Sequence, residues 1–109
     1  MKKILLKDFQ KLDLRVGTII AAEKIRESQN LLRIEVDLGK EKRQIISGIN
    51  KQYQPESLVD RQIVIIANLE PKTIFGLESQ GMLLAPEDGN GNCVLLIPEK
   101  DIDSGTKVH

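Results

Sequence analysis

The strongest constraint on the fold is the alternation of apolar and polar residues over residues 32–38. Leucine, isoleucine or valine occupies every second position from Leu32 to Leu38, and charged residues stand between them. Because successive side chains of a strand point to opposite faces, this pattern predicts a β-strand. One face of the strand is expected to contact a core, and the other to face water.

Five other segments carry the apolar or β-branched runs that are typical of strands. A bulge or sharp bend is expected at Gly17, because glycine inside a strand often marks such a site. Residues 86–92 are rich in Gly, Asn and Asp and therefore predict a turn between two strands of a hairpin. These five further segments are 14–25, 43–49, 62–67, 82–85 and 93–97.

Helical signals are few and short. Asp8 is placed to cap a turn that contains Phe9 and Leu12, and Pro55 stands in the first turn of another short segment. No helix is long enough to connect parallel strands, so an antiparallel sheet is expected. We therefore predict an all-β fold, a five-stranded oligonucleotide-binding (OB) Greek-key barrel with short helical turns and terminal extensions. No linker or repeat is visible, so residues 1–109 are predicted to form one domain.

Residue counts exclude most catalytic and metal-binding chemistry. Histidine occurs once, as His109, which removes most metal sites, histidine-dependent nucleophiles and histidine acid–base chemistry. Cys93 lies in an apolar run without a nearby cation, so packing is favoured over a nucleophilic role. Residues 88–92 resemble the start of a calcium loop, but Cys93 takes the place of the required glycine, so a plain turn is favoured. We predict a binding module that is not an enzyme and has no cofactor and no metal.

Other absences narrow the compartment and the mode of binding. A single cysteine forms no intramolecular disulfide, and the sequence contains neither a signal segment nor an apolar run long enough to span a membrane. These features predict a cytoplasmic protein without a membrane partner. Aromatic residues make up 3% of the chain, so base stacking on a row of aromatic side chains is nearly excluded.

The charge is unevenly distributed although its net value is zero. Residues 1–44 hold eleven basic and seven acidic side chains, a net +4, and the remainder carries −4. This polarity suggests an anionic partner on one face. An accidental distribution over a mixed surface is the alternative, and charge alone favours it.

The segment 68–82 is expected to form a loop between two strands, and it concentrates polar groups that are suited to RNA. Asn68 offers an amide, Lys72 a point charge, and Ser79 a hydroxyl for a phosphate or ribose oxygen. Met82 offers a surface for a base or sugar, and the alternative is a structured loop with a buried methionine. Further positive charge is expected beside this segment if the barrel brings three more side chains close to it: Arg33, Lys42 and Arg43.

Five motifs in register carry a resemblance to a known family. They are Asp13-Leu14-Arg15-Val16-Gly17, Val36-Asp37-Leu38-Gly39, Ser47-Gly48-Ile49, Asn68-Leu69-Glu70-Pro71-Lys72 and Glu78-Ser79-Gln80-Gly81-Met82. With these motifs, the chain resembles the tRNA-binding domain family over residues 8–108. That family occurs at the C-terminus or in the beta subunit of methionyl-tRNA synthetase, as free-standing tRNA-binding proteins, and in eukaryotic synthetase-associated factors.

The resemblance implies an OB-fold homodimer that binds tRNA by shape and does not aminoacylate it. The catalytic subunit of methionyl-tRNA synthetase is an expected further partner. The chain departs from the family at Asn30 and Thr73, where basic residues are common, so we expect weaker RNA binding than in relatives. The resemblance assigns tRNA contact to Arg33, Asn68, Lys72, Ser79 and Met82.

Two questions remain open from the sequence. The resemblance implies dimerisation through segments outside the barrel core, so dimer contacts are expected at Phe9, Ile102 and Val108, with packing onto the barrel end as an equal alternative. A chaperone-like, peptide-binding dimer is the alternative function, because a branch of the same fold family has that role. Peptide capture requires an exposed apolar groove, whereas polar side chains are expected near the segment 68–82.

Overall fold

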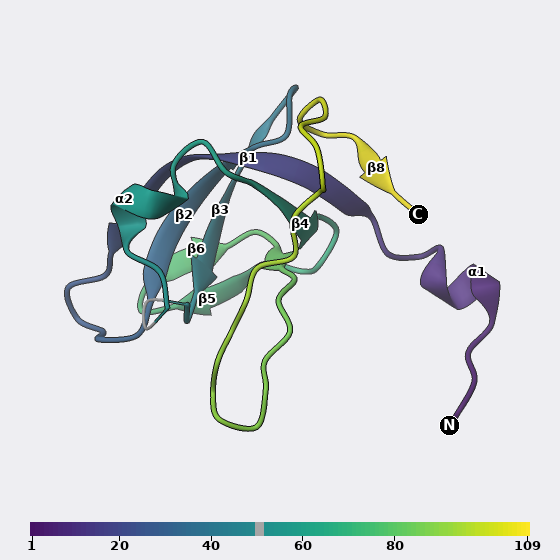
Figure 1. Cartoon of the computed structure of the whole chain (residues 1–109), viewed down its shortest axis with the longest axis horizontal. Coiled ribbons are helices and arrows are strands. Elements are labelled where there is room, and N and C mark those ends of the chain that lie inside the picture. The colour runs from purple at the N-terminus through teal and green to yellow at the C-terminus, as the bar shows by residue number, and fades with distance from the viewer. Residues whose placement is uncertain (50–51) are drawn as a thin grey trace.

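The computed structural model describes residues 1–49 and 52–109 of the chain (Figure 1). It contains two helices of one turn each and eight strands. The helices are α1 (Leu6–Phe9) and α2 (Pro55–Leu58). The strands are β1 (Leu14–Lys24), β2 (Leu32–Asp37), β3 (Lys42–Ser47), β4 (Gln62–Ile66), β5 (Lys72–Ile74), β6 (Leu77–Ser79), β7 (Met82–Leu83) and β8 (Lys107–Val108).

The long strand β1 organises the main sheet, whose order is β3-β2-β1-β4-β7. The second half of β1 pairs with β2, and its first half pairs with β4, in both cases antiparallel. β1 curves over the others and therefore belongs to both sides of a barrel (Figure 1). The predicted all-β, five-stranded barrel is confirmed.

Side chains help to close the barrel between β3 and the chain that precedes β7. The Gln80 N–H donates to the Gln44 carbonyl oxygen at 2.7 Å, and the Gln44 N–H donates to the Gln80 side-chain oxygen at 2.9 Å. The Ile46 N–H donates to the Ser79 hydroxyl oxygen at 3.0 Å. These bonds occupy edge groups of β3 that would otherwise lack partners, because β3 ends the order of the sheet.

Valine, isoleucine and leucine fill the core, as the scarcity of aromatic residues requires. The alternation in β2 is confirmed, because Leu32, Ile34 and Val36 are fully buried while the residues between them are half-buried. Burying side chains of this kind contributes about 1.5–3 kcal/mol each. The other members of the core cluster are Ile19, Leu38, Ile45, Ile49, Leu58, Ile63, Ile65, Ala67, Leu83 and Leu95.

Gly17 has a different role from the one predicted. The irregularity of β1 falls at Ile20, where the register against β2 skips from Ile19 to Ala21. A Cβ at Gly17 would lie 2.3 Å from the Val36 side chain. Glycine is therefore required here for the close approach of β1 and β2, and the predicted bulge at Gly17 is wrong.

Three other local predictions are wrong. Residues 93–97 form no strand, because only an isolated bridge joins Glu87 to Cys93, although Leu96 N–H still donates to the Leu84 carbonyl oxygen. Asp8 lies inside α1, whose N-cap position is Leu5, so it does not cap that helix. The segment 68–82 is not simply a loop, because it contains the hairpin of β5 and β6.

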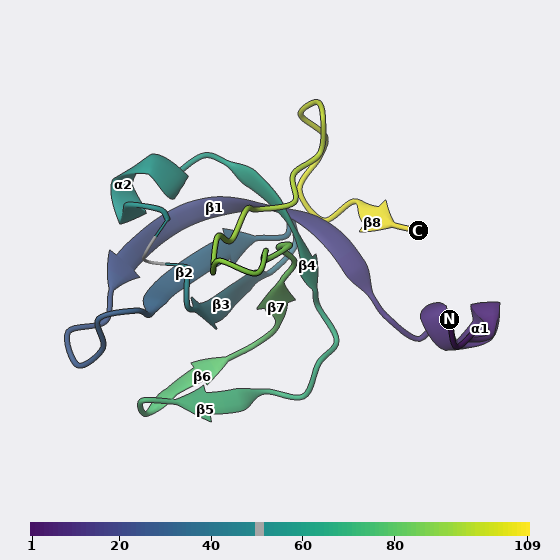
Figure 2. The ribbon, with the colours of Figure 1, turned by 60° about the horizontal axis from the view of Figure 1, so that its bottom comes forward.

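The two terminal segments lie beyond the same end of β1 (Figure 1). β8 pairs with residues 14 and 15 of β1, and α1 projects from the barrel next to it (Figure 2). Pro55 begins α2, as predicted, and α2 covers the other end of the barrel. Neither helix in the described part of the chain has the length or apolarity needed to span a membrane.

Candidate nucleic-acid interface

The hairpin of β5 and β6 stands apart from the barrel as a small second layer (Figure 2). Its two strands pair from Lys72 opposite Ser79 to Ile74 opposite Leu77. Phe75 and Gly76 form the turn between them, with φ angles of +50° and +74°. Two positive φ values suit a two-residue hairpin turn, because they match the right-handed twist of the strands.

A groove of about 490 Å³ lies between this hairpin and the barrel. Its wall is mainly apolar, and two of its apolar side chains are substantially exposed, Leu69 by 40% and Met82 by 47%. Lys72 and Glu70 place one charge of each sign in its lining. The lining residues are Ile46, Leu69, Glu70, Lys72, Ile74, Ser79, Gly81 and Met82.

Three of the seven predicted site residues meet in this groove. Lys72 is exposed, and its ammonium makes no ion pair with any described residue. Met82 is exposed as well, so it is not the buried methionine of the alternative interpretation. Ser79 is only 6% exposed, and its hydroxyl accepts from Ile46 N–H and donates to the Gly81 carbonyl oxygen at 3.3 Å. The Ser79 hydroxyl is therefore used within the chain.

Two further predicted residues use their polar groups to hold loops in place. The Arg43 guanidinium donates to the carbonyl oxygens of Ala67 (2.7 Å) and Gln80 (3.2 Å). It also pairs with the carboxylate of Glu41, in the turn that precedes β3. The Asn68 side chain accepts from Asp13 N–H at 2.8 Å and donates to the Lys11 carbonyl oxygen at 2.7 Å. Arg43 thus fixes the groove's surroundings, and Asn68 fixes the chain that enters β1.

Arg33 reaches the hairpin through a chain of hydrogen bonds across the sheet. Its guanidinium donates to the Glu23 carboxylate at 2.6 Å and to the Gln44 side-chain oxygen at 3.2 Å. The Gln44 side chain then donates to the Glu78 carbonyl oxygen on β6 at 2.9 Å. Lys42, at the start of β3, is exposed and forms no ion pair among the described residues.

The residues that sequence reasoning missed are those that shape the groove. Gln44 and Gln80 connect β3 to the chain before β7, and Ile46 and Ile74 provide apolar lining. A signal for the hairpin was present, because short alternating segments flank Phe75-Gly76 and glycine is favoured in such turns.

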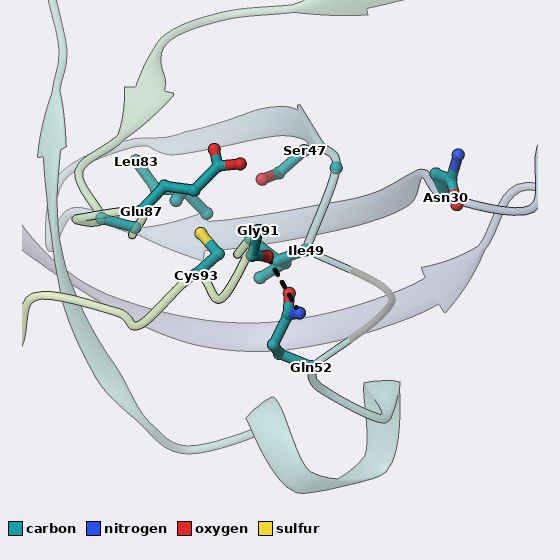
Figure 3. A pocket seen from close by; sticks show the side chains of 10 residues that line it. Asn30, Ser47, Ile49, Gln52, Leu83, Glu87, Gly91 and Cys93 are labelled. Atoms are coloured by element: carbon teal, nitrogen blue, oxygen red, sulfur yellow. Dashed lines mark hydrogen bonds between the residues drawn. The ribbon is translucent and has the colours of Figure 1, made fainter. Parts of the chain in front are cut away.

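A second pocket, of about 370 Å³, lies around Cys93 (Figure 3). The side chains of Ser47, Glu87 and Cys93 lie around it, and Gln52 donates to the Gly91 carbonyl oxygen at 3.3 Å. Burial raises the pKa of the Cys93 thiol, and the negative charge of Glu87 raises it further. The thiol is therefore protonated at neutral pH and is a poor nucleophile, and Cys93 packs against the core as predicted.

Hydrogen bonds within the turn at residues 88–92 satisfy the carboxylate of Asp88. Asp88 accepts hydrogen bonds from the N–H groups of Asn90 and Asn92 and from the Asn92 side chain, at 2.8–3.0 Å. These bonds lower the pKa of Asp88. Such bonding is typical of an Asx turn, so the plain-turn interpretation is confirmed.

Residues 14–107 match the family model described as "Putative tRNA binding domain". The chain belongs to the tRNA-binding domain family. The match includes the whole groove and every predicted site residue of this tRNA-binding domain.

Three similar proteins illustrate the range of the family. A methionine–tRNA ligase of Methanothrix thermoacetophila is 60% identical over 97 residues, which are 89% of this chain and 14% of that protein. A structure titled as a MetRS-related protein from Pyrococcus horikoshii has 35% identity and a TM-score of 0.94, with both chains covered completely. A structure titled as the chaperone CsaA of Bacillus anthracis has 35% identity and a TM-score of 0.91, covering 99% of this chain and 100% of the other. The chain spans about one seventh of the curated ligases that it matches.

Proposed function

We propose that residues 1–109 act as one non-catalytic module that binds folded tRNA. The observation that carries this proposal is the groove beside the β5–β6 hairpin, where Lys72 and Met82 are exposed within the matched family segment. The module works in the cytoplasm, either free-standing or as the beta subunit or C-terminal appendage of methionyl-tRNA synthetase, and the synthetase's catalytic subunit is its further partner.

Recognition depends on the shape of folded tRNA. The chain has three aromatic residues, which are too few for a row of single-stranded bases to stack on. Contacts to phosphate and ribose suit folded RNA instead. Lys72 and Lys42 provide positive charge that no ion pair among the described residues neutralises, and Met82 packs against a sugar or base. Arg33, which pairs with Glu23, keeps the site in shape together with Ser79, Asn68 and Arg43.

Direct binding measurements test this proposal. Folded tRNAs of several identities should bind with similar affinity, and the affinity should decrease as the salt concentration rises, because bound cations on the RNA are released. An unstructured RNA of the same length is the matched competitor. Equal affinity for the unstructured RNA, or affinity that is independent of salt, would contradict shape recognition.

The N-terminal segment supports a homodimer as the working form. Ile4, Leu5 and Leu6 are exposed by 58–73% on a segment that projects from the barrel (Figure 2). Three neighbouring apolar side chains in water are unusual for a segment without a partner. Light scattering should give twice the mass of the chain, and a Leu6→Glu variant should give the monomer mass. A monomer mass for the parent would contradict this assembly.

A chaperone-like peptide-binding role is the second candidate. The groove is more apolar than the sequence led us to expect, and the structure titled as the chaperone CsaA supports this role. An extended apolar peptide would occupy the groove between Leu69 and Met82. Saturable binding of such a peptide, with no effect of folded tRNA on it, would favour this function over tRNA binding.

A further inference from the structure

Phe75 is the most exposed of the chain's three aromatic residues. Phe9 is half-buried in a pocket with Val108, and Tyr53 packs against the core while its hydroxyl accepts from Leu95 N–H at 3.1 Å. Phe75 is 60% exposed at the tip of the β5–β6 hairpin. Its ring is neither a member of the core cluster nor packed against it, so packing does not explain a large apolar residue at this position.

The backbone at Phe75 makes this residue type more unexpected. Its φ of +50° lies in the left-handed region, which is uncommon for a bulky side chain. The other non-glycine residue with positive φ in the described chain is Asp60, a type that tolerates this conformation. Asn or Gly at position 75 would suit the turn better. An exposed aromatic ring on a strained backbone at the tip of a hairpin therefore points to binding.

Basic side chains lie beside the hairpin tip. A shallow pocket joins Leu77, the residue that follows the turn, to the end of β1 and to Arg33. Lys24 and Arg26 line it and form no ion pair among the described residues, whereas Glu23 pairs with Arg33. Glu27 is the second acidic residue of this lining. Figure 2 places the tip beside the loop between β1 and β2.

We propose that the Phe75 ring stacks on an unpaired base of the bound tRNA. Lys24 and Arg26, which line the same pocket as Leu77, are the cations that would contact the phosphates next to this base. The inference rests on the proposed tRNA binding and adds one base contact to it. A single ring is compatible with shape recognition, because folded tRNA exposes unpaired bases only at defined places.

A Phe75→Trp variant tests stacking directly, because the chain has no tryptophan of its own. A base stacked on the new indole should quench its fluorescence when tRNA binds, while the affinity stays within about twofold of the parent. The matched control is the same titration at high salt, where tRNA does not bind. Binding at the parent's affinity without a change in fluorescence would overturn the proposal.

Two further variants separate stacking from folding and from apolar contact. Phe75→Asn removes the ring but suits the turn, so its melting temperature should equal or exceed that of the parent while tRNA affinity falls roughly 5- to 150-fold. Phe75→Leu keeps an apolar side chain without a flat face, and its affinity should fall similarly. If either variant binds tRNA like the parent, stacking at Phe75 is wrong. If the parent binds no RNA, the proposed function fails as well.

Discussion

Replacing Ser79 with alanine should destabilise the fold more than it weakens a contact to RNA. Ser79 is 6% exposed, and its hydroxyl is the acceptor for the Ile46 N–H on β3. Ser79→Ala leaves this buried donor without a partner, which costs about 1–3 kcal/mol. For a domain of this size, the melting temperature should fall by about 4 °C for each kcal/mol.

Thermal unfolding followed by circular dichroism measures this effect, with Ser57→Ala as the matched control. The Ser57 hydroxyl donates to the Gln54 carbonyl oxygen at 2.8 Å at an exposed position of α2, where water can take the place of the hydroxyl. The control should change stability by less than about 0.5 kcal/mol. If Ser79→Ala melts like the parent but binds tRNA more weakly, the hydroxyl faces RNA and the structural reasoning is refuted.

Three other predictions concern the charged side chains of Lys72, Arg43 and Asp88. Lys72→Ala should weaken all tRNAs alike and reduce the salt slope by about one, because one phosphate contact is lost; the melting temperature should not change, and Lys100→Ala is the control in the same binding titration. Arg43→Ala should lower the melting temperature, and Arg43→Lys should not restore it, because an ammonium cannot reproduce the guanidinium's bonds to two carbonyl oxygens and a carboxylate; a fully restored melting curve would contradict this. The pKa of Asp88 is lowered by the Asn92 side chain and by the N–H groups of Asn92 and Asn90, so its stabilising effect should be complete above its ordinary pKa of 3.8 and should be lost as the pH falls through the lower folded value; an NMR titration that finds a pKa above 3.8 would refute it.

Local patterns with a strict period were sufficient to predict most of the barrel. The alternation from Leu32 to Leu38 placed β2 correctly, and Pro55 marked the start of α2. The pattern was insufficient where pairing depends on distant residues. Residues 93–97 are as apolar as a strand, but they bond irregularly to Leu84 and to Val64 on β4. A bulge was predicted at Gly17 because the sequence alone does not show the close approach to Val36, which arises only when β1 and β2 pair.

The chemical groups of the candidate site were easier to predict than their roles. Lys72 and Met82 are exposed in the groove, as binding residues must be. Ser79, Asn68 and Arg43 were chosen for the same polar groups, yet each of them bonds to backbone atoms of its own chain. A sequence lists donors and acceptors but does not reveal their partners, because these come from segments more than 20 residues away.

Methyl NMR of protein labelled at methionine tests the central claim most directly. The chain has two methionines, Met82 in the groove and Met1 at the exposed N-terminus, so the spectrum has its own internal control. Folded tRNA should shift or broaden the Met82 signal in a saturable manner and leave Met1 unchanged, while unstructured RNA of the same length should have a much smaller effect. If tRNA binding reaches saturation by an independent measurement while the Met82 signal stays in place, the groove is not the tRNA-binding site.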